Sequence, residues 1–296
     1  MKKIVPILFA WALLMACNPQ PQKAGNEPEM DEFVDQEAVS SQAMEATPAQ
    51  SITVDGREIK MYELPAKLND RPELILHRKS FTISYNKTTK TPNWVAWHLT
   101  KSHTHGHIQR ELQAFDEDPS VPKPRATLDG YYNSRYDRGH MCPAGDNKWN
   151  EEAMSQTFRL TNICPQNHGL NKNGWNDLEI QCRDWAREYN AVDIVCGPIY
   201  RTATYTDGKM RPSTDQKFIG KNKVWVPDAF FKVVLCRGKQ PKAIGFIYEN
   251  RGGQQLMREC MCSVDEVERI TGINFYHLLA DDIEDRIEAE ANLRKW

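Results

Sequence analysis

β-Rich segments and helical patterns follow one another in an irregular order, and this order constrains the fold more than any other feature of the sequence. Helical patterns occur at 151–158, 174–189 and 264–271, and the last begins with a capping box, in which Ser263 is followed three residues later by Glu266. Alternating or continuous apolar runs predict strands at 80–85, 94–100, 192–196, 228–235 and 243–248. We therefore expect an α+β fold with a mixed, mainly antiparallel sheet and packed helices.

The composition permits one large domain or two small ones. With 40% hydrophobic and 26% charged residues among 296, the chain is ordinary for a globular protein, so disorder throughout is excluded. The formal net charge of −2 does not by itself suit a protein that binds a polyanion. Residues 51–262, however, contain 31 basic and 24 acidic side chains, a surplus of seven. This charge permits nucleic-acid binding without demonstrating it.

The first 17 residues have the features of an export signal. Lys2 and Lys3 precede an apolar run, 4–16, that is too short to span a bilayer as a helix. The segment 14–17 resembles the lipobox of bacterial lipoproteins, in which cleavage before the cysteine leaves Cys17 as a lipidated N-terminus. We therefore expect an exported lipoprotein, anchored to a membrane through Cys17 and facing the periplasm or the cell exterior. The alternative is an ordinary signal peptide with an incidental cysteine.

Residues 18–60 predict a disordered acidic tether. This segment is rich in Pro, Gln, Glu, Ser and Ala, and its first thirty residues contain almost no large apolar side chains. The folded domain is expected over residues 61–296. Its seven cysteines allow up to three disulfides and one free thiol in an oxidising compartment. Cys260 and Cys262 lack the two-residue spacer of a zinc knuckle, so a structural zinc site is not expected.

Between residues 136 and 183 the chain contains the residue types that phosphodiester hydrolysis requires, namely a base, a cation ligand and positive donors. His140 is the candidate base because an imidazole with an ordinary pKa of about 6.5 can accept a proton from water at neutral pH. Arg138 would share its face on a strand. A histidine in such a polar segment is also typical of a turn, and for Asp137 we favour a local ion pair with Arg138.

Asn171 is the candidate magnesium ligand, because Mg²⁺ prefers oxygen ligands and keeps several of its own waters. On one helix, Asn171, Trp175, Glu179 and Arg183 would lie along a slowly drifting stripe and so face the same site. The structural alternatives are a helix cap at Asn171 and an exposed ion pair between Glu179 and Arg183.

Three motifs together resemble the DNA/RNA non-specific endonuclease family, the sugar-non-specific nucleases of the ββα-metal class. They are the tetrapeptide Asp-Arg-Gly-His at 137–140, the hexapeptide Thr-Asn-Ile-Cys-Pro-Gln at 161–166, and the segment 171–179. Their order and spacing are similar to those of the family, which is more specific than any single motif. The similarity extends over about 64–290.

The resemblance implies a ββα-metal active-site motif. In it His140 would be the general base, and Asn171 the direct ligand of Mg²⁺, with Mn²⁺ as a substitute. Glu179 would hold metal-bound waters, and Asn162 would support the site by hydrogen bonding.

The resemblance also implies that Arg138 and Arg183 contact phosphate. Arg110 is the choice for an upstream family arginine, with Arg125 and Arg135 as alternatives. The extra cysteines depart from the family pattern.

The sequence thus predicts a magnesium-dependent endonuclease that hydrolyses DNA and RNA without sequence specificity, and no obligate protein partner is inferred. Two alternatives stay open. A run of histidines (His98, His103, His105 and His107) is compatible with a metal-capture lipoprotein. The chain is also compatible with a catalytically inactive nucleic-acid-binding module on the same fold.

Overall fold

A seven-stranded sheet forms the centre of the computed structural model, which describes residues 51–54, 57–132 and 134–296. Every pairing within this sheet is antiparallel. In sheet order its strands are β15 (Met261–Cys262), β14 (Lys242–Glu249), β13 (Ala229–Cys236), β8 (Ala191–Ile199), β5 (Thr91–Thr100), β4 (Thr82–Asn86) and β3 (Leu74–His77). The α+β fold with a mainly antiparallel sheet is therefore confirmed.

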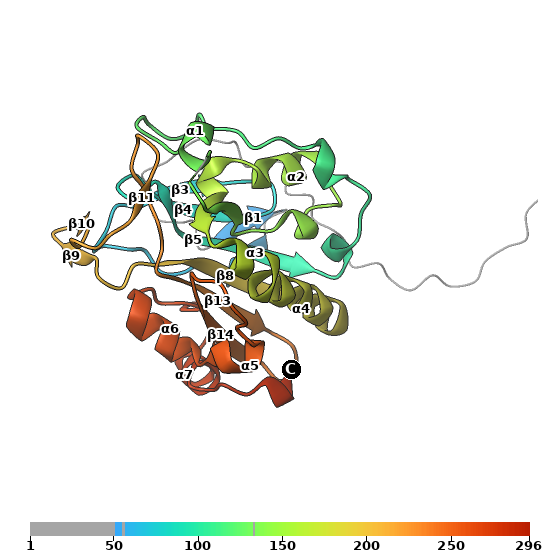
Figure 1. Cartoon of the computed structure of the whole chain (residues 1–296). Helices are drawn as coiled ribbons and strands as arrows, with labels where there is room; N and C mark the ends of the chain where they lie inside the picture. The colour runs from blue at the N-terminus through green and yellow to red at the C-terminus, as the bar shows by residue number, and fades with distance from the viewer. Residues whose placement is uncertain (1–50, 55–56, 133) are drawn as a thin grey trace, which may run out of the picture. The chain divides into compact units, whose positions relative to one another are not determined.

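Helices cover both faces of this sheet (Figure 1). Successive side chains of a strand point to opposite faces, and in β13 Val234 packs in the cluster that contains α4, while Val233 packs in the cluster that contains α6. The helices are α1 (Leu128–Tyr131), α2 (Glu151–Thr157), α3 (His168–Lys172), α4 (Gly174–Tyr189), α5 (Met257–Cys260), α6 (Val264–Thr271) and α7 (Asp281–Glu288). The Ser263 half of the capping box forms, because the Ser263 side chain accepts a hydrogen bond from the Glu266 backbone nitrogen at 3.1 Å; the Glu266 carboxylate pairs with Arg269 instead of returning to Ser263.

A small hairpin followed by two helices lies on the α4 side of the sheet. Its strands are β6 (Asp137–His140) and β7 (Ile163–Gln166), which pair antiparallel, and α3 and α4 follow directly. The indole of Trp175 in α4 donates to the backbone oxygen of His140 at 3.2 Å and so ties the helix to β6. This ββα unit positions the candidate site.

Shorter elements complete the described part of the chain. The remaining paired strands are β1 (Ser51–Val54) with β2 (Arg57–Lys60), β9 (Thr204–Thr206) with β10 (Lys209–Arg211), and β11 (Phe218–Ile219) with β12 (Val224–Trp225). The 3₁₀ turns are η1 (Ser102–Thr104), η2 (Arg110–Leu112), η3 (Ala144–Asp146), η4 (Leu160–Asn162) and η5 (Leu293–Lys295).

The expected signal segment 1–17, with Cys17, and most of the expected tether 18–60 lie outside the described residues. The hairpin of β1 and β2 occupies the last part of that tether. Across the residues that the structure describes, no helix has both the length and the apolar character needed to cross a membrane.

The seven cysteines between residues 142 and 262 are free thiols in the structure, so the disulfides expected from the sequence are not formed. Five of them are buried, and buried thiols pack as small apolar side chains.

Candidate active site

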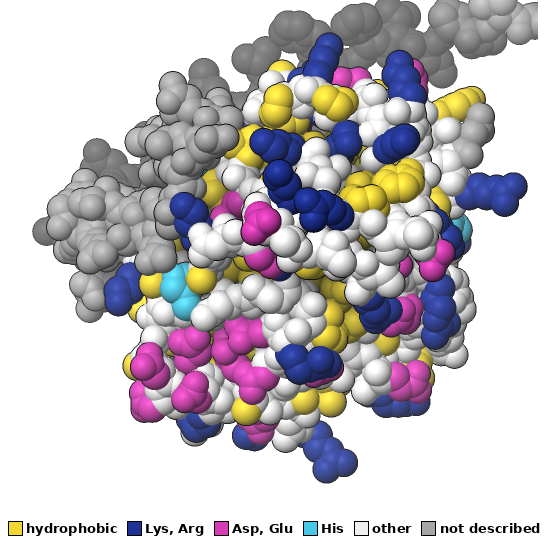
Figure 2. Space-filling view, turned by 90° about the vertical axis from the view of Figure 1, so that its left-hand side faces the viewer, with side chains coloured by type: hydrophobic (Ala, Val, Ile, Leu, Met, Phe, Trp, Pro, Cys, Tyr) yellow, Lys and Arg dark blue, Asp and Glu magenta, His cyan; other side chains and the backbone are white. Residues whose placement is uncertain are grey.

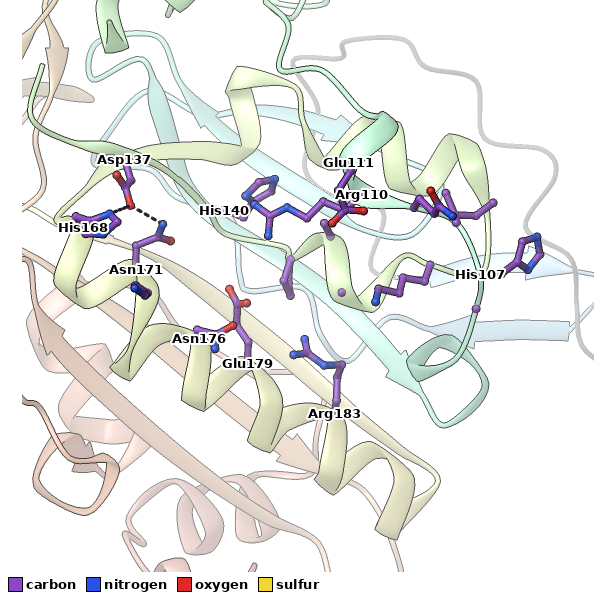
Figure 3. A pocket seen from close by; sticks show the side chains of 18 residues that line it. His107, Arg110, Glu111, Asp137, His140, His168, Asn171, Asn176, Glu179 and Arg183 are labelled. Carbon is purple, nitrogen blue, oxygen red and sulfur yellow. Dashed lines mark hydrogen bonds and ion pairs between the residues drawn. The ribbon is translucent and has the colours of Figure 1, made fainter. Parts of the chain in front are cut away.

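One cavity of about 610 Å³ brings together side chains from distant parts of the chain. Its lining comes from the loop 106–111, from the segment 137–148 that begins with β6, and from α3 and α4. Figure 3 shows His140, Asn171 and Glu179 pointing toward the same space. The imidazole and the amide, about thirty residues apart in sequence, therefore lie in one site.

His140 is held as a neutral imidazole. It is only 7% exposed and packs edge-on against Phe158, with the ring centroids 4.9 Å apart. Burial, together with the positive charges of Arg110 and Arg138, lowers the pKa of His140 to about 3. Its Nε2 atom is shielded from solvent and has no hydrogen-bond partner among the described residues, so a proton from the cavity would reach the ring through Nδ1.

Asp137 orients the side chain of Asn171. The Asn171 amide nitrogen donates to Asp137 Oδ2 at 2.9 Å, and His168 Nδ1 lies 3.0 Å from the same oxygen (Figure 3). Because the nitrogen is bound to this carboxylate, the amide oxygen faces the cavity. The local Asp137–Arg138 ion pair favoured from the sequence is not formed; Asp137 contacts α3 instead.

Asn171 and Glu179 belong to different helices, which departs from the single stripe that the sequence suggested. The chain breaks helical geometry at Asn173, which has φ −112° and ψ −100°, so α3 ends at Lys172 and α4 begins at Gly174. Both side chains nevertheless line the cavity.

Glu179 is a carboxylate near two positively charged side chains, Lys232 and Arg183. Burial raises the pKa of Glu179 to about 7, and the positive charges of Lys232 and Arg183 oppose this rise. No hydrogen bond or ion pair occupies the Glu179 carboxylate within the described part of the chain. Its oxygens are therefore free to bind a ligand in the cavity.

Arg183 is fixed by a buried carboxylate. Its Nη1 atom donates to Asp146 Oδ1 at 2.8 Å, and the indole of Trp97 donates to Asp146 Oδ2 at 3.1 Å. The Asp146 side chain is 1% exposed, whereas that of Arg183 is 14% exposed. The guanidinium thus reaches the cavity wall from a rigid support.

The remaining predicted arginines are divided between the cavity and the surface. Arg110, in η2, lines the cavity. Arg138 does not; it is exposed and its guanidinium lies 4.3 Å from the Phe115 ring centroid. The two alternatives to Arg110, namely Arg125 and Arg135, do not line the cavity. Arg125 is instead paired with Glu117 at 3.1 Å.

Asn162 is completely buried and does not reach the cavity. Its Nδ2 atom donates to the backbone oxygens of Cys142 and Thr157, each at 2.9 Å, and its Oδ1 accepts from the Cys142 nitrogen at 2.9 Å. Two of these bonds hold the backbone just after His140, and the third connects this backbone to the end of α2. Any support that Asn162 gives the site therefore passes through the backbone, and its expected role stays a prediction.

The donor set fits a hard divalent cation. An amide oxygen oriented by Asp137 and a carboxylate without a protein partner both line the cavity, and oxygen ligands of this kind suit Mg²⁺.

The histidines upstream of η2 do not form a comparable set. His98 contacts Asp193 at 2.6 Å, His103 stacks on Trp149 at 4.2 Å, and His105 is exposed. Among the described residues, the His, Cys, Asp and Glu side chains that lie close enough together to share one metal ion do not include a histidine.

Two supporting residues, Asp146 and Lys232, were missed by sequence reasoning, and the role of Asp137 was misassigned. Asp146 carried no signal beyond its nearness to the motifs. Lys232 did carry one, because it is a single lysine within the otherwise apolar strand β13. Its ammonium is completely buried, 4.4 Å from the ring centroid of Trp175. A charge inside such a strand is expensive and indicates a partner charge nearby.

Comparisons with known proteins agree on one family. The family model for DNA/RNA non-specific endonucleases matches residues 58–282. The mitochondrial nuclease EXOG of Xenopus laevis is 36% identical over 231 residues, which cover 76% of this chain and 63% of that protein. Human mitochondrial endonuclease G is 32% identical over 223 residues, covering 74% of this chain and 73% of that protein. The chain thus spans less than two thirds of the length of the EXOG relative.

A solved structure shares the fold. A chain from the crystal structure of the EndoG/EndoGI complex aligns with a TM-score of 0.64 and 28% identity, covering 70% of this chain and 86% of that chain.

The expected localisation is wrong. The sequence predicted an exported lipoprotein anchored at Cys17 and facing the periplasm or cell exterior, but the EXOG and endonuclease G relatives are both mitochondrial nucleases. A positively charged start followed by apolar residues is a short and degenerate signal. For this reason the pattern did not identify an export signal with certainty.

Proposed function

Because this chain belongs to the DNA/RNA non-specific endonuclease family, we propose that it hydrolyses phosphodiester bonds of DNA and RNA with the help of Mg²⁺. The observation that carries the proposal is the shared cavity of His140, Asn171 and Glu179. We assign the activity to residues 61–296, the expected endonuclease domain.

His140 acts as the general base in this proposal. Its lowered pKa keeps the imidazole unprotonated at neutral pH, and Nδ1 accepts a proton from the attacking water. A pKa of about 3 alone would make a weak base. A bound phosphate brings negative charge into the cavity and raises the pKa of His140 toward neutrality.

Asn171 and Glu179 would hold the metal ion, Asn171 directly and Glu179 through the waters that Mg²⁺ retains. When bound, Mg²⁺ supplies positive charge to the phosphate oxygens and the leaving oxygen, and Mn²⁺ would serve in its place. Asp137 keeps the Asn171 oxygen directed at this position.

Arginines supply the phosphate contacts. Arg110 and Arg183 line the cavity, and Arg138 lies just outside it beside Phe115. Contacts to phosphate carry no sequence information, whereas base edges do. Since charged and polar groups dominate this cavity, we expect cleavage without sequence specificity.

The experiment is cleavage of plasmid DNA and of RNA by the purified protein with Mg²⁺ and with excess chelator. His140→Ala should lower kcat by roughly 10²- to 10⁴-fold, the usual contribution of a general base. A matched control is the double variant His103→Ala with His105→Ala, which removes two histidines outside the proposed site. Full activity of His140→Ala, or equal loss in the control, would contradict the assignment; full activity in chelator would contradict the metal requirement.

A further inference from the structure

Three carboxylates gather between α6 and α7, on the face of the sheet opposite α4 and the cavity. Asp265 and Glu268 lie on successive turns of α6, and Glu288 is the last residue of α7. One oxygen from each side chain lies within 4.8 Å of the other two. This cluster is independent of the nuclease site.

Glu288 is buried without a partner. It is 3% exposed, and its Oε1 atom has no hydrogen-bond partner among the described residues. Burying a carboxylate without a compensating contact is costly. A carboxyl group in this position either holds a proton or binds a cation.

The surroundings add negative charge. Five acidic residues and one arginine occupy α7, and α6 has three acidic residues and one arginine. That arginine, Arg269, is bound to Glu266 at 2.7 Å and so does not neutralise the cluster. Figure 2 shows acidic side chains gathered on the molecular face at the level of α6 and α7.

We propose that Asp265, Glu268 and Glu288 form a second cation site, for a hard divalent ion of the Ca²⁺ type, that links α6 to α7. Ca²⁺ binds oxygen ligands at about 2.3–2.6 Å, so two oxygens on opposite sides of one ion are about 4.6–5.2 Å apart. The observed separations, up to 4.8 Å, fit within this limit. Asp265 is exposed, which leaves room for the waters that complete a coordination shell of six to eight oxygens.

Binding at this site would stabilise the fold. Val267 of α6 and Ile287 of α7 pack in the same hydrophobic cluster against the sheet. A ligand that binds only the folded state at about 100 times its Kd should raise the Tm by roughly 5–10 °C for a domain of this size. Catalysis is not required for this effect.

The test is thermal unfolding of the metal-free full chain, with CaCl₂ added against KCl of equal ionic strength to exclude screening. Ca²⁺ should raise the Tm of the wild type, of Asn171→Ala in the nuclease cavity, and of the control Glu266→Gln. The shift should disappear in Glu288→Gln and in Asp265→Asn. Asp265 is exposed, so its variant stays folded and informative even if Glu288→Gln does not.

The proposal is overturned by any of three results. One is no rise in wild-type Tm at about 10 mM Ca²⁺, well above the Kd range of extracellular calcium modules. Another is an equal rise with KCl, which would mean screening of the acidic surface. The third is a rise that persists in Asp265→Asn and Glu288→Gln, or that is lost in Asn171→Ala, because the ion would then bind elsewhere.

Discussion

Replacing Lys232 with methionine should move the acidic limb of the pH profile to higher pH. The ammonium is completely buried in β13 and has no hydrogen-bond partner among the described residues. Of the charges that oppose the effect of burial on Glu179, that of Lys232 is the largest. The pKa of Glu179 is raised to about 7, so its carboxylate is ionised above that pH and becomes protonated as the pH falls through it.

The size of the effect follows from the charge that is removed. An opposite charge a few ångströms away lowers the pKa of a carboxyl group by about 1–3 units. With a pKa of about 7, the carboxyl group of Glu179 is ionised in roughly three quarters of the molecules at pH 7.5. If the pKa rises by one unit, that fraction falls to roughly one quarter. Activity at pH 7.5 should therefore fall about 3-fold for a one-unit rise and about 25-fold for two units.

Two opposing effects act on stability. Methionine is close to lysine in volume and removes the cost of burying an ammonium, but it also removes a positive charge that offsets the carboxylates of Asp146 and Glu179. The free energy of unfolding should therefore be unchanged or lower. Recovery of activity at high pH distinguishes the shifted pKa from general unfolding of the core, which would lower activity at every pH.

The assay is kcat/KM between pH 6 and 10 at one Mg²⁺ concentration for the wild type, Lys232→Met and Lys239→Met, an exposed control. A nearby divalent cation lowers every midpoint, so the difference between proteins is the measured quantity. We expect Lys232→Met alone to shift by one unit or more and to recover wild-type activity at high pH. An unshifted midpoint with uniformly lower activity would refute the reasoning.

Two further substitutions test the supports of the site. Asp146→Asn breaks the buried ion pair that holds Arg183, so the free energy of unfolding should fall by about 3–5 kcal/mol in urea titrations. The KM should also rise by a larger factor than kcat falls. An unchanged KM would show that Arg183 does not contact substrate. Asn162→Ala removes three buried hydrogen bonds, two of them to the Cys142 backbone, and should lower the free energy of unfolding by about 2–5 kcal/mol; a loss below about 1 kcal/mol would contradict this role.

Local patterns were sufficient for much of the fold. The apolar run of β13 and the capping box at Ser263 depend on neighbouring residues, and both elements form where they were predicted. The family motifs likewise identified His140 and Asn171, which the structure brings to one cavity.

The rest depends on contacts between residues far apart in sequence. Asp137 orients Asn171 across 34 positions, and no local pattern distinguishes that bond from an ion pair with Arg138. The pKa of His140 likewise follows from burial by the assembled fold, so the ordinary imidazole value used for the sequence did not apply. Lys232 acts on Glu179 only once β13 lies beneath α4.

A double-mutant cycle on His140 and Asn171 tests the central claim, that both act on one phosphodiester in one cavity. The measurement is kcat/KM for the wild type, His140→Ala, Asn171→Ala and the double variant, in an assay sensitive enough to resolve the product of the two single losses. Residues that act as a unit are non-additive, so the double variant should be about as slow as the slower single variant. Losses that multiply would mean that the two side chains act independently, and would contradict the account.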